Sequence, residues 1–382
     1  MRIAQARSVL LSHRTDPSDP MVWVGGRIDS WDAALVEVTD EDGQTGLGEV
    51  AQGIMASAAV PGILEALRPY LIGADISDPS TLGDALRAKS YFWARGGIAS
   101  GVIGALEIAA WDLAGKRAGR PAYELMGGAT KDRIEAYASG GLGTTFEQVA
   151  AWVEAMQDAG FKTVKFRAME NPDRTIELVD HLVPLIRSGN RGILDAVQGC
   201  AGSPWTVADA IRVGQHLEGK PIRWYEEPRR IDDVEGYVAV REAIEVPVSG
   251  AESLALAEDL IELVEAGGVD IVQPDVCMMG GPAQFQRVAR AAAGVGATAV
   301  PHVWGSGVTL MANLHVSFAT AEVALFEWCT LTNPLREALM VEPLQLVDSA
   351  ILPPRAPGLG VALTHEIEDA FPFHTGGGHV IR

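Results

Sequence analysis

The sequence predicts an α/β protein in which a (β/α)8-type barrel, a modified TIM barrel, carries an N-terminal α+β capping domain. Two observations predict it. The first 130 residues begin as alternating strand patterns and continue as helices, whereas residues 131–351 repeat a short apolar strand, a turn and an amphipathic helix. Strands that alternate with helices favour parallel βαβ units, and eight such units form a closed barrel. A doubly wound open sheet is the main alternative, but no GxGxxG or Walker-type loop supports it.

The predicted capping domain, residues 1–130, opens with strands. RIAQARSVLL alternates apolar and polar residues, and AALVEVTDEDGQTGLGEV predicts two strands joined by a turn that contains Asp-Gly. Helices are expected at about 59–71, 79–90 and 99–119, where apolar residues recur at helical spacing. A sheet followed by helices is typical of an α+β domain.

The predicted barrel, residues 131–351, contains eight candidate strands. They are IEAYASG, TVKFRA, GILDAV, RWYEEP, VPVSGAE, VDIVQPD, TAVPHV and VALFEW. Amphipathic stretches such as TFEQVAAWVEAMQDAG lie between them, although no eighth helix is clear. The last segment, about 352–382, is expected to return to the capping domain.

Composition narrows the classes of function. The chain has 382 residues, a formal net charge of −20, 48% hydrophobic and 21% charged residues, as expected of a globular protein. Its acidity disfavours nucleic-acid and membrane partners. The three cysteines show no CxxC spacing, and neither a signal peptide nor a long apolar run is evident. A cytoplasmic location is therefore expected.

Seven of the strands end on a polar or charged residue. They are Lys165, Asp195, Glu226, Glu252, Asp275, His302 and Glu327. The intervals between successive members are each close to one strand–helix unit. Because the C-terminal ends of barrel strands surround one mouth, these side chains are expected to converge there.

Three members of this series are carboxylates on consecutive strands: Asp195, Glu226 and Glu252. Such a cluster repels itself unless a cation sits between its members, and oxygen ligands suit Mg²⁺, with Mn²⁺ as the alternative. Unconnected rim charges are the competing interpretation. Glu227 faces the other side of its strand, so we expect it to be an outer acceptor or a partner of Arg229 or Arg230.

The remaining members predict acid–base chemistry. Asp275 beside His302 would orient the imidazole as a general base, although a satisfied core histidine is the alternative. Lys165 and Arg167 share one face of their strand and would hold an anionic substrate. A metal and a lysine beside a substrate carboxylate favour removal of the α-proton, because both lower the cost of the second negative charge.

These motifs resemble the mandelate racemase and muconate lactonizing enzyme branch of the enolase superfamily over most of the chain. The segments that carry the resemblance are ALEIAAWDLAGK, VKFR, LDAVQG, WYEEP, SGAES, VDIVQPD, VPHVWGSG, LFEW and PGLGV. The resemblance implies Mg²⁺ on Asp195, Glu226 and Glu252, a His302–Asp275 dyad, and Glu327 as a hydrogen-bonding partner of the substrate carboxylate. Within the family, QPDVCMMGG and NPLREAL are most similar to galactarolactone cycloisomerase and sugar-acid dehydratases. The resemblance also implies a homo-oligomer.

Two positions depart from the family pattern. Arg167 replaces the second lysine of K-x-K, and a guanidinium is a poor base. We therefore favour elimination with one base, by a sugar-acid dehydratase or lactone cycloisomerase, over a racemase or epimerase that uses Arg167 or Lys165 as the second base. Val197 stands where relatives often carry Asn, so a polar group is expected to be missing near the metal. A non-catalytic, metal-stabilised binding protein is the third interpretation.

Specificity is expected to come from capping loops near residues 13–30 and 50–57. His13, Arg14, Trp23 and Arg27 are candidates there, although ordinary loop roles are favoured for each. The tail FHTGGGHVIR carries two histidines, and we expect both to lie free of the site.

Overall fold

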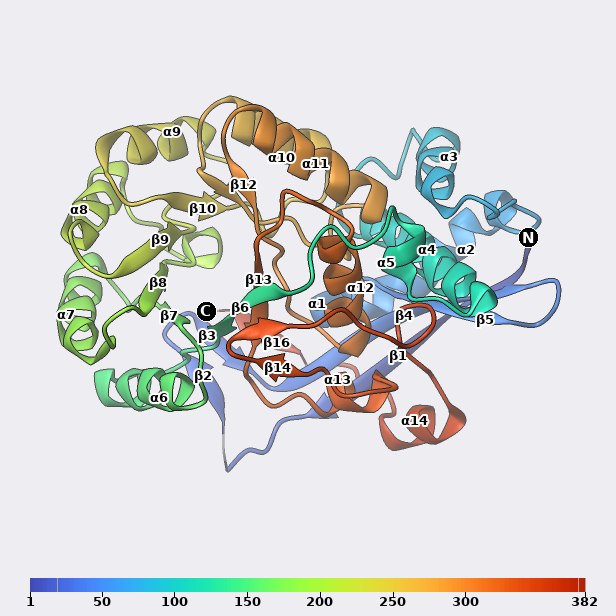
Figure 1. Cartoon of the computed structure of the whole chain (residues 1–382), viewed down its shortest axis with the longest axis horizontal. Coiled ribbons are helices and arrows are strands. Elements are labelled where there is room, and N and C mark those ends of the chain that lie inside the picture. The colour runs from blue at the N-terminus through green and yellow to red at the C-terminus, as the bar shows by residue number, and fades with distance from the viewer. Residues whose placement is uncertain (19, 377, 382) are drawn as a thin grey trace.

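The computed structural model describes residues 1–18, 20–376 and 378–381. Eight parallel strands form the barrel predicted from the sequence (Figure 1). They are β6 (Ile134–Ser139), β7 (Thr163–Arg167), β8 (Arg191–Asp195), β9 (Ile222–Glu226), β10 (Val248–Gly250), β11 (Ile271–Val272), β12 (Thr298–Ala299) and β13 (Leu325–Cys329). Neighbours pair from β6 to β12, β13 pairs with β6, and a bridge between Ala299 and Val323 closes the ring.

Seven helices follow the first seven barrel strands. They are α6 (Phe146–Asp158), α7 (Pro172–Leu182), α8 (Val207–Leu217), α9 (Val234–Ala243), α10 (Ala257–Glu265), α11 (Pro282–Gly294) and α12 (Gly307–Phe318). Most bury one face, but every residue of α12 is buried. A helix covered on all sides is mostly apolar, and its few polar side chains are hydrogen-bonded, as Asn313 and Ser317 are here. The helix that comes directly after β13 is the short α13 (Pro334–Leu339), which explains why no eighth barrel helix is clear in the sequence.

The N-terminal region forms a three-stranded antiparallel sheet with helices on it. The sheet has the order β1–β4–β5, from β1 (Ile3–Arg14), β4 (Ser30–Asp40) and β5 (Thr45–Glu49). Its helices are α1 (Gly53–Ala56), α2 (Val60–Leu71), α3 (Leu82–Lys89), α4 (Gly97–Ala118) and α5 (Ala122–Leu125). The three predicted helices correspond to α2, α3 and α4, whereas the short helices α1 and α5 were not predicted. In Figure 1 this blue-to-teal region lies beside the barrel.

The sequence was expected to contain no long apolar run, but helix α4 is long and apolar enough, by length and composition only, to cross a membrane. However, 83% of its apolar window is buried inside the protein. Close packing on the sheet explains this composition: a Cβ at Gly48 would meet the carbonyl oxygen of Ala105 at 1.9 Å. Helix α4 is therefore a core helix, and small residues such as Gly48 allow its backbone to lie close to strand β5.

The C-terminal segment runs from the barrel back to the N-terminal region. A hairpin of β14 (Leu346–Val347) and β15 (Ala350–Ile351) pairs with β6, and α14 (His365–Ala370) follows. The last strand, β16 (His379–Ile381), pairs antiparallel with β3 (Gly26–Ile28), which also pairs with β2 (Met21–Trp23). The boundaries of the two domains stay a prediction.

Candidate active site

The inward direction of the candidate side chains follows from a hydrophobic plug inside the barrel. Tyr137, Ile193, Trp224, Val300 and Leu325 form this buried cluster, and the rings of Tyr137 and Trp224 meet edge to face at 5.3 Å. Side chains two residues apart on a strand share a face. The strand-end residues two positions beyond Ile193, Trp224, Val300 and Leu325 therefore also point into the barrel: Asp195, Glu226, His302 and Glu327.

The three predicted metal ligands meet at this mouth. One carboxylate oxygen from each of Asp195, Glu226 and Glu252 lies within 4.8 Å of the others. Asp195 and Glu226 are buried, whereas the Glu252 side chain is 23% exposed. The Oε2 atom of Glu252 is buried and has no hydrogen-bond partner among the described residues. A free carboxylate oxygen in an all-oxygen cluster fits a hard divalent cation.

Two cations lie against these carboxylates. Lys165 Nζ is 2.7 Å from Glu226 Oε1 and 3.5 Å from Asp195 Oδ2, and Arg167 pairs with Asp195. Burial lowers the pKa of Lys165, but Glu226 and Glu327 outweigh burial and raise that pKa well above its ordinary value. Lys165 therefore stays protonated in this arrangement.

His302 and Asp275 form a dyad. His302 Nδ1 lies 3.0 Å from Asp275 Oδ2, which leaves Nε2 on the side of Glu252, 3.7 Å from its Oε2. Burial lowers the pKa of His302, but Glu252 and the hydrogen bond with Asp275 raise it to about 10. The negative charge of Glu252 is the largest of the influences that raise this pKa, and a cation bound to that carboxylate would weaken it.

The other oxygen of Asp275 is held by groups that the sequence did not reveal. Asp275 Oδ1 accepts hydrogen bonds from the Cys277 backbone N–H and from Asn313 Nδ2, each at 2.9 Å. Asn313 lies on α12, where its amide is buried, and a polar side chain within a mostly apolar helix is the one signal in the sequence that could have pointed to it. These bonds fix the carboxylate that orients His302.

Glu327, the predicted partner of a substrate carboxylate, is already engaged. Its Oε1 lies 2.8 Å from Lys165 Nζ, and its Oε2 accepts the Val303 N–H at 2.8 Å. Burial raises the pKa of Glu327, but Lys165 and His302 outweigh burial and lower it to about 2. As an ionised group it cannot donate a hydrogen bond to a second carboxylate. Its predicted role therefore requires Lys165 to shift toward the substrate, or Glu327 to gain a proton.

The structure revises the expectations for Glu227 and Val197. Glu227 is buried and does not pair with Arg229 or Arg230, which bond to Asp233 and Asp232. Val197 has a φ of 49°, in the left-handed region that a β-branched residue seldom adopts. This turn aims the Val197 N–H at Asp195 Oδ1, at 2.9 Å, so the backbone supplies a polar contact beside the ligand set.

The four residues proposed for the capping loops differ in exposure and in their contacts. Arg27 is exposed and pairs with Asp29 at 2.7 Å, and the His13 ring meets Phe371 edge to face at 6.0 Å. Trp23 is buried. None of the contacts of Arg14 assigns it to the mouth.

One expectation for the tail is wrong. His379 does not lie free, because its Nε2 accepts a hydrogen bond from Trp304 Nε1 at 2.8 Å. Trp304 in turn faces Arg167, whose Cζ is 5.6 Å from the ring centroid. His374, by contrast, is exposed as expected. Strand β16 brings His379 to the mouth, and its three residues are too few to show a strand pattern in the sequence.

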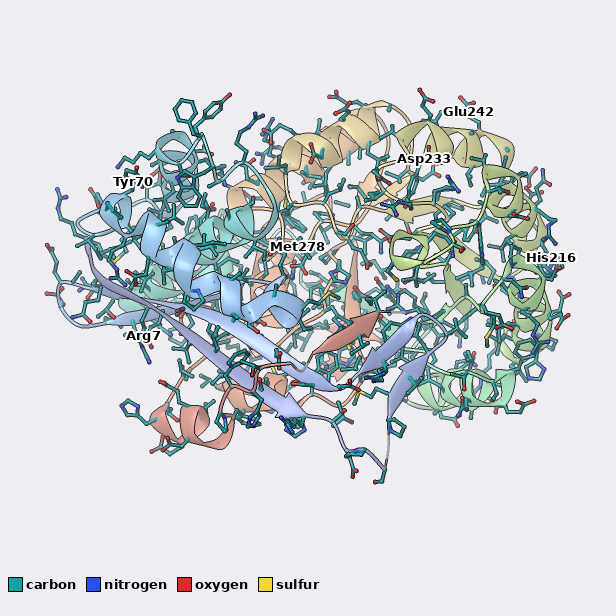
Figure 2. All side chains as sticks on the ribbon, turned by 180° about the vertical axis from the view of Figure 1, so that it is seen from behind. Arg7, Tyr70, His216, Asp233, Glu242 and Met278 are labelled. Atoms are coloured by element: carbon teal, nitrogen blue, oxygen red, sulfur yellow. The ribbon has the colours of Figure 1, made fainter. Side chains whose placement is uncertain are left out.

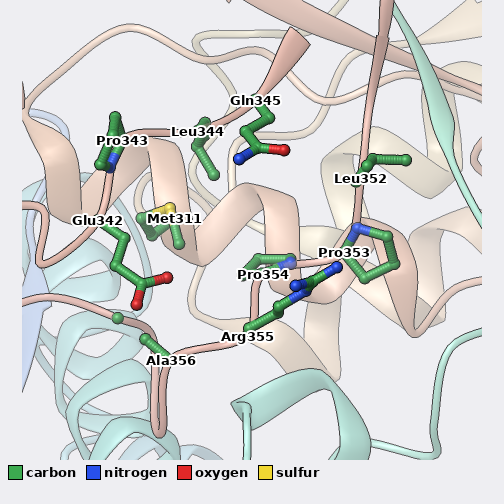
Figure 3. A pocket seen from close by; sticks show the side chains of 11 residues that line it. Met311, Glu342, Pro343, Leu344, Gln345, Leu352, Pro353, Pro354, Arg355 and Ala356 are labelled. Atoms are coloured by element: carbon green, nitrogen blue, oxygen red, sulfur yellow. The ribbon is translucent and has the colours of Figure 1, made fainter. Parts of the chain in front are cut away.

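A cavity and a surface histidine lie outside the mouth. A cavity of about 130 Å³ lies between α12 and the C-terminal segment, lined by residues such as Met311, Glu342 and Arg355 (Figure 3). It contains none of the strand-end residues. His216 lies on an outer helix, away from the mouth, and its Nε2 is 2.7 Å from Asp180 (Figure 2).

Comparison with known proteins gives the family. Residues 6–127 match the mandelate racemase / muconate lactonizing enzyme N-terminal domain, and residues 148–367 match the enolase C-terminal domain-like family. The D-galactarolactone cycloisomerase of Agrobacterium fabrum is 29% identical over 96% of this chain and 97% of its own. The arabinonate dehydratase of Saccharolobus solfataricus is 28% identical over 86% and 87% of the two chains.

A solved structure supports the same assignment. A racemase from Streptomyces coelicolor with bound magnesium superposes with a TM-score of 0.85 at 25% identity, covering 97% of this chain and 99% of that one. The domain order, the barrel and the capping region all agree with the family, and so do relatives named as cycloisomerases and dehydratases. The chain is therefore an enzyme, a lyase or isomerase, that belongs to the mandelate racemase and muconate lactonizing enzyme branch of the enolase superfamily.

Proposed function

We propose that the protein removes the proton α to the carboxylate of a hydroxylated acid and then expels the oxygen on the β-carbon. On an open-chain sugar acid the leaving group is water, which is a dehydratase reaction. On a sugar lactone it is the ring oxygen, which is a ring-opening cycloisomerase reaction. One observation carries the proposal: the Nε2 of an imidazole that Asp275 orients lies 3.7 Å from Glu252, a member of a carboxylate trio to which Lys165 and Arg167 are bound.

Asp195, Glu226 and Glu252 would hold Mg²⁺, or Mn²⁺ as the alternative. Their oxygen donors and the unpaired Oε2 of Glu252 fit such an ion. The five strand-end carboxyl groups, Asp195, Glu226, Glu252, Asp275 and Glu327, also outnumber the two permanent cations, Lys165 and Arg167. The ion supplies positive charge that stabilises negative charge developing on the substrate. Its presence in this protein is part of the proposal.

The chain's own residues would carry the proton. His302 Nε2 accepts the α-proton, the C–H electron pair moves into the carboxylate, and Lys165 neutralises part of the charge of the resulting enediolate. As this charge returns to form the C=C bond, the β C–O bond breaks and the imidazolium gives its proton to the leaving oxygen. The enol product then becomes a 2-keto acid.

A racemase or epimerase is the alternative in the same family. It needs a second base on the opposite face of the substrate, and Lys165 or Arg167 would have to supply it. Their carboxylate partners raise the pKa of both groups, so neither is ready to accept a proton. This favours elimination over racemisation. Self-association and a cytoplasmic location stay predictions.

A substrate screen tests the proposal. Sugar monoacids, diacids and their lactones are incubated with Mg²⁺, and release of 2-keto acid is measured in D₂O and H₂O. We expect 2-keto acid from at least one substrate and loss of turnover in EDTA. Deuterium entering the α-carbon without elimination would support the racemase. Loss of thermal stability in EDTA, with no turnover of any substrate, would support a binding protein with a structural metal.

A further inference from the structure

The end of the chain is built into the cap over the barrel mouth. In β16, His379 pairs with Ile28 and Ile381 pairs with Gly26 of β3, on the side of β3 opposite β2. The carbonyl oxygen of Gly378 accepts the Asp29 N–H at 3.0 Å, and a Cβ at Gly378 would meet the Ile54 carbonyl oxygen at 2.7 Å. The terminal strand therefore lies between the two capping loops, near residues 13–30 and 50–57.

The side chain of His379 points from this strand to the barrel. Its ring meets Trp31 edge to face at 5.3 Å, and Trp31 packs against Trp304 at 5.6 Å. Because Trp304 Nε1–H can only donate, His379 Nε2 must be the acceptor and the neutral ring carries its proton on Nδ1. Burial lowers the pKa of His379 to about 4, which preserves the acceptor at neutral pH.

Trp304 connects this contact to the charged mouth. It lies two residues after His302, and its indole faces the guanidinium of Arg167 at 5.6 Å, within the range of a cation–π contact. Arg167 bonds to Asp195, and its side chain is only 12% exposed. The indole thus limits where the guanidinium can lie, and the hydrogen bond to His379 limits where the indole can lie.

We propose that His379 is a positioning residue of the active site: by accepting the indole N–H of Trp304, it holds that ring against Arg167 and so sets the place of the cation that receives the anionic substrate. The terminal strand thereby becomes part of the substrate-binding wall. The consequence for catalysis rests on the proposed function, whereas the position of the indole does not.

The experiment compares His379→Gln, whose amide oxygen can accept the indole proton, with His379→Phe, which fills a similar volume but accepts nothing. His374→Phe, on the exposed part of the same tail, is the control. The first readout is the indole N–H resonance of Trp304 in protein labelled with ¹⁵N-tryptophan, assigned with Trp304→Phe and measured without substrate. We expect it to move upfield in His379→Phe and to stay near the wild-type position in His379→Gln.

The second readout is kinetic, on the substrate found in the screen. Loss of a hydrogen bond of this kind predicts a rise in KM of about 3- to 10-fold in His379→Phe. We expect a smaller change in kcat and near-normal KM in His379→Gln. An unmoved indole resonance in His379→Phe overturns the proposal even if no substrate is found. Equal losses of kcat and thermal stability in both variants also overturn it, because they indicate a purely structural role.

Discussion

The barrel mouth and the capping sheet are in contact through Trp304 and His379 but are built in opposite ways. At the mouth each reacting group comes from a separate buried strand, and charged contacts hold it, as Lys165 is held by Glu226 and Glu327. In the capping sheet three strands of three residues each, β2, β3 and β16, come from the two ends of the chain. Among the described residues, a hydrogen bond and an edge-to-face aromatic contact at 6.2 Å between Trp304 and His379 link that sheet to the barrel.

This difference suggests a division of labour. Buried charges held by several partners are expensive to rearrange, so the mouth is suited to chemistry that needs fixed geometry. Short strands with few contacts are easily altered, so the capping sheet is suited to binding and specificity. Substitutions at the mouth should therefore act mainly on kcat and on stability, and substitutions in the capping sheet mainly on KM.

The largest effect is expected at the mouth, for His302→Asn. Asparagine can retain a hydrogen bond to Asp275 but cannot accept a proton, so kcat should fall by about 10²- to 10⁴-fold. Circular dichroism and thermal melting should stay close to wild type. His216→Asn is the matched control, since His216 also contacts a carboxylate but on the outer surface (Figure 2). Turnover within about tenfold of wild type in His302→Asn would remove His302 from the role of base.

The next effect is on stability, for Lys165→Met. The substitution leaves Glu226 and Glu327 buried without the cation they share, so the free energy of unfolding should fall by about 3–5 kcal/mol. Urea titration in the absence of added metal measures it. Lys89→Met, at an exposed position, is the control and should change the free energy of unfolding by less than about 0.5 kcal/mol. A loss no larger than that of the control would contradict the view that the mouth is held by charge.

A smaller effect is expected in the capping sheet, for Gly26→Ala. A Cβ there would lie 2.2 Å from the Val380 carbonyl oxygen, so β16 has to move away from β3. We expect KM to rise by about two- to fivefold while kcat stays within about twofold. Gly62→Ala on α2 is the control, since nothing lies within 4 Å of its Cβ, and it should stabilise the helix by about 0.5–1 kcal/mol. A fall in kcat without a change in KM would break the division between the two regions.

The two regions also differ in how far the sequence predicts them. The barrel strands, their order and their strand-end residues were predictable. Period-two alternation and a repeated strand–helix unit fix which of their side chains face the mouth. Asn313 was missed because its position on a fully buried helix has no periodic signal. His379 was placed wrongly because its partner Trp304 lies far away in the chain, and a three-residue strand after a glycine run shows no alternation. Contacts made by side chains between distant segments depend on the packed structure.

The last expected effect is on stability in acid, where the two regions should lose stability in different pH ranges. The folded-state pKa of His379 is lowered from 6.5 to about 4, so the unfolded chain binds this proton first as the pH falls. Its contribution to stability is present above pH 6.5 and is lost between 6.5 and 4. The pKa of Glu327 is lowered from 4.5 to about 2, so its contribution is lost only below pH 4.5.

We therefore expect wild type to lose more stability than His379→Phe between pH 7 and 4.5, by on the order of 1 kcal/mol because the ring is partly exposed. Urea titrations of both proteins at the two pH values measure this difference. Other titrating groups are common to both proteins and cancel. Equal losses in the two proteins would mean that His379 is protonated within the folded cap at mildly acidic pH, and the hydrogen bond from Trp304 could not then be the link between the capping sheet and the mouth.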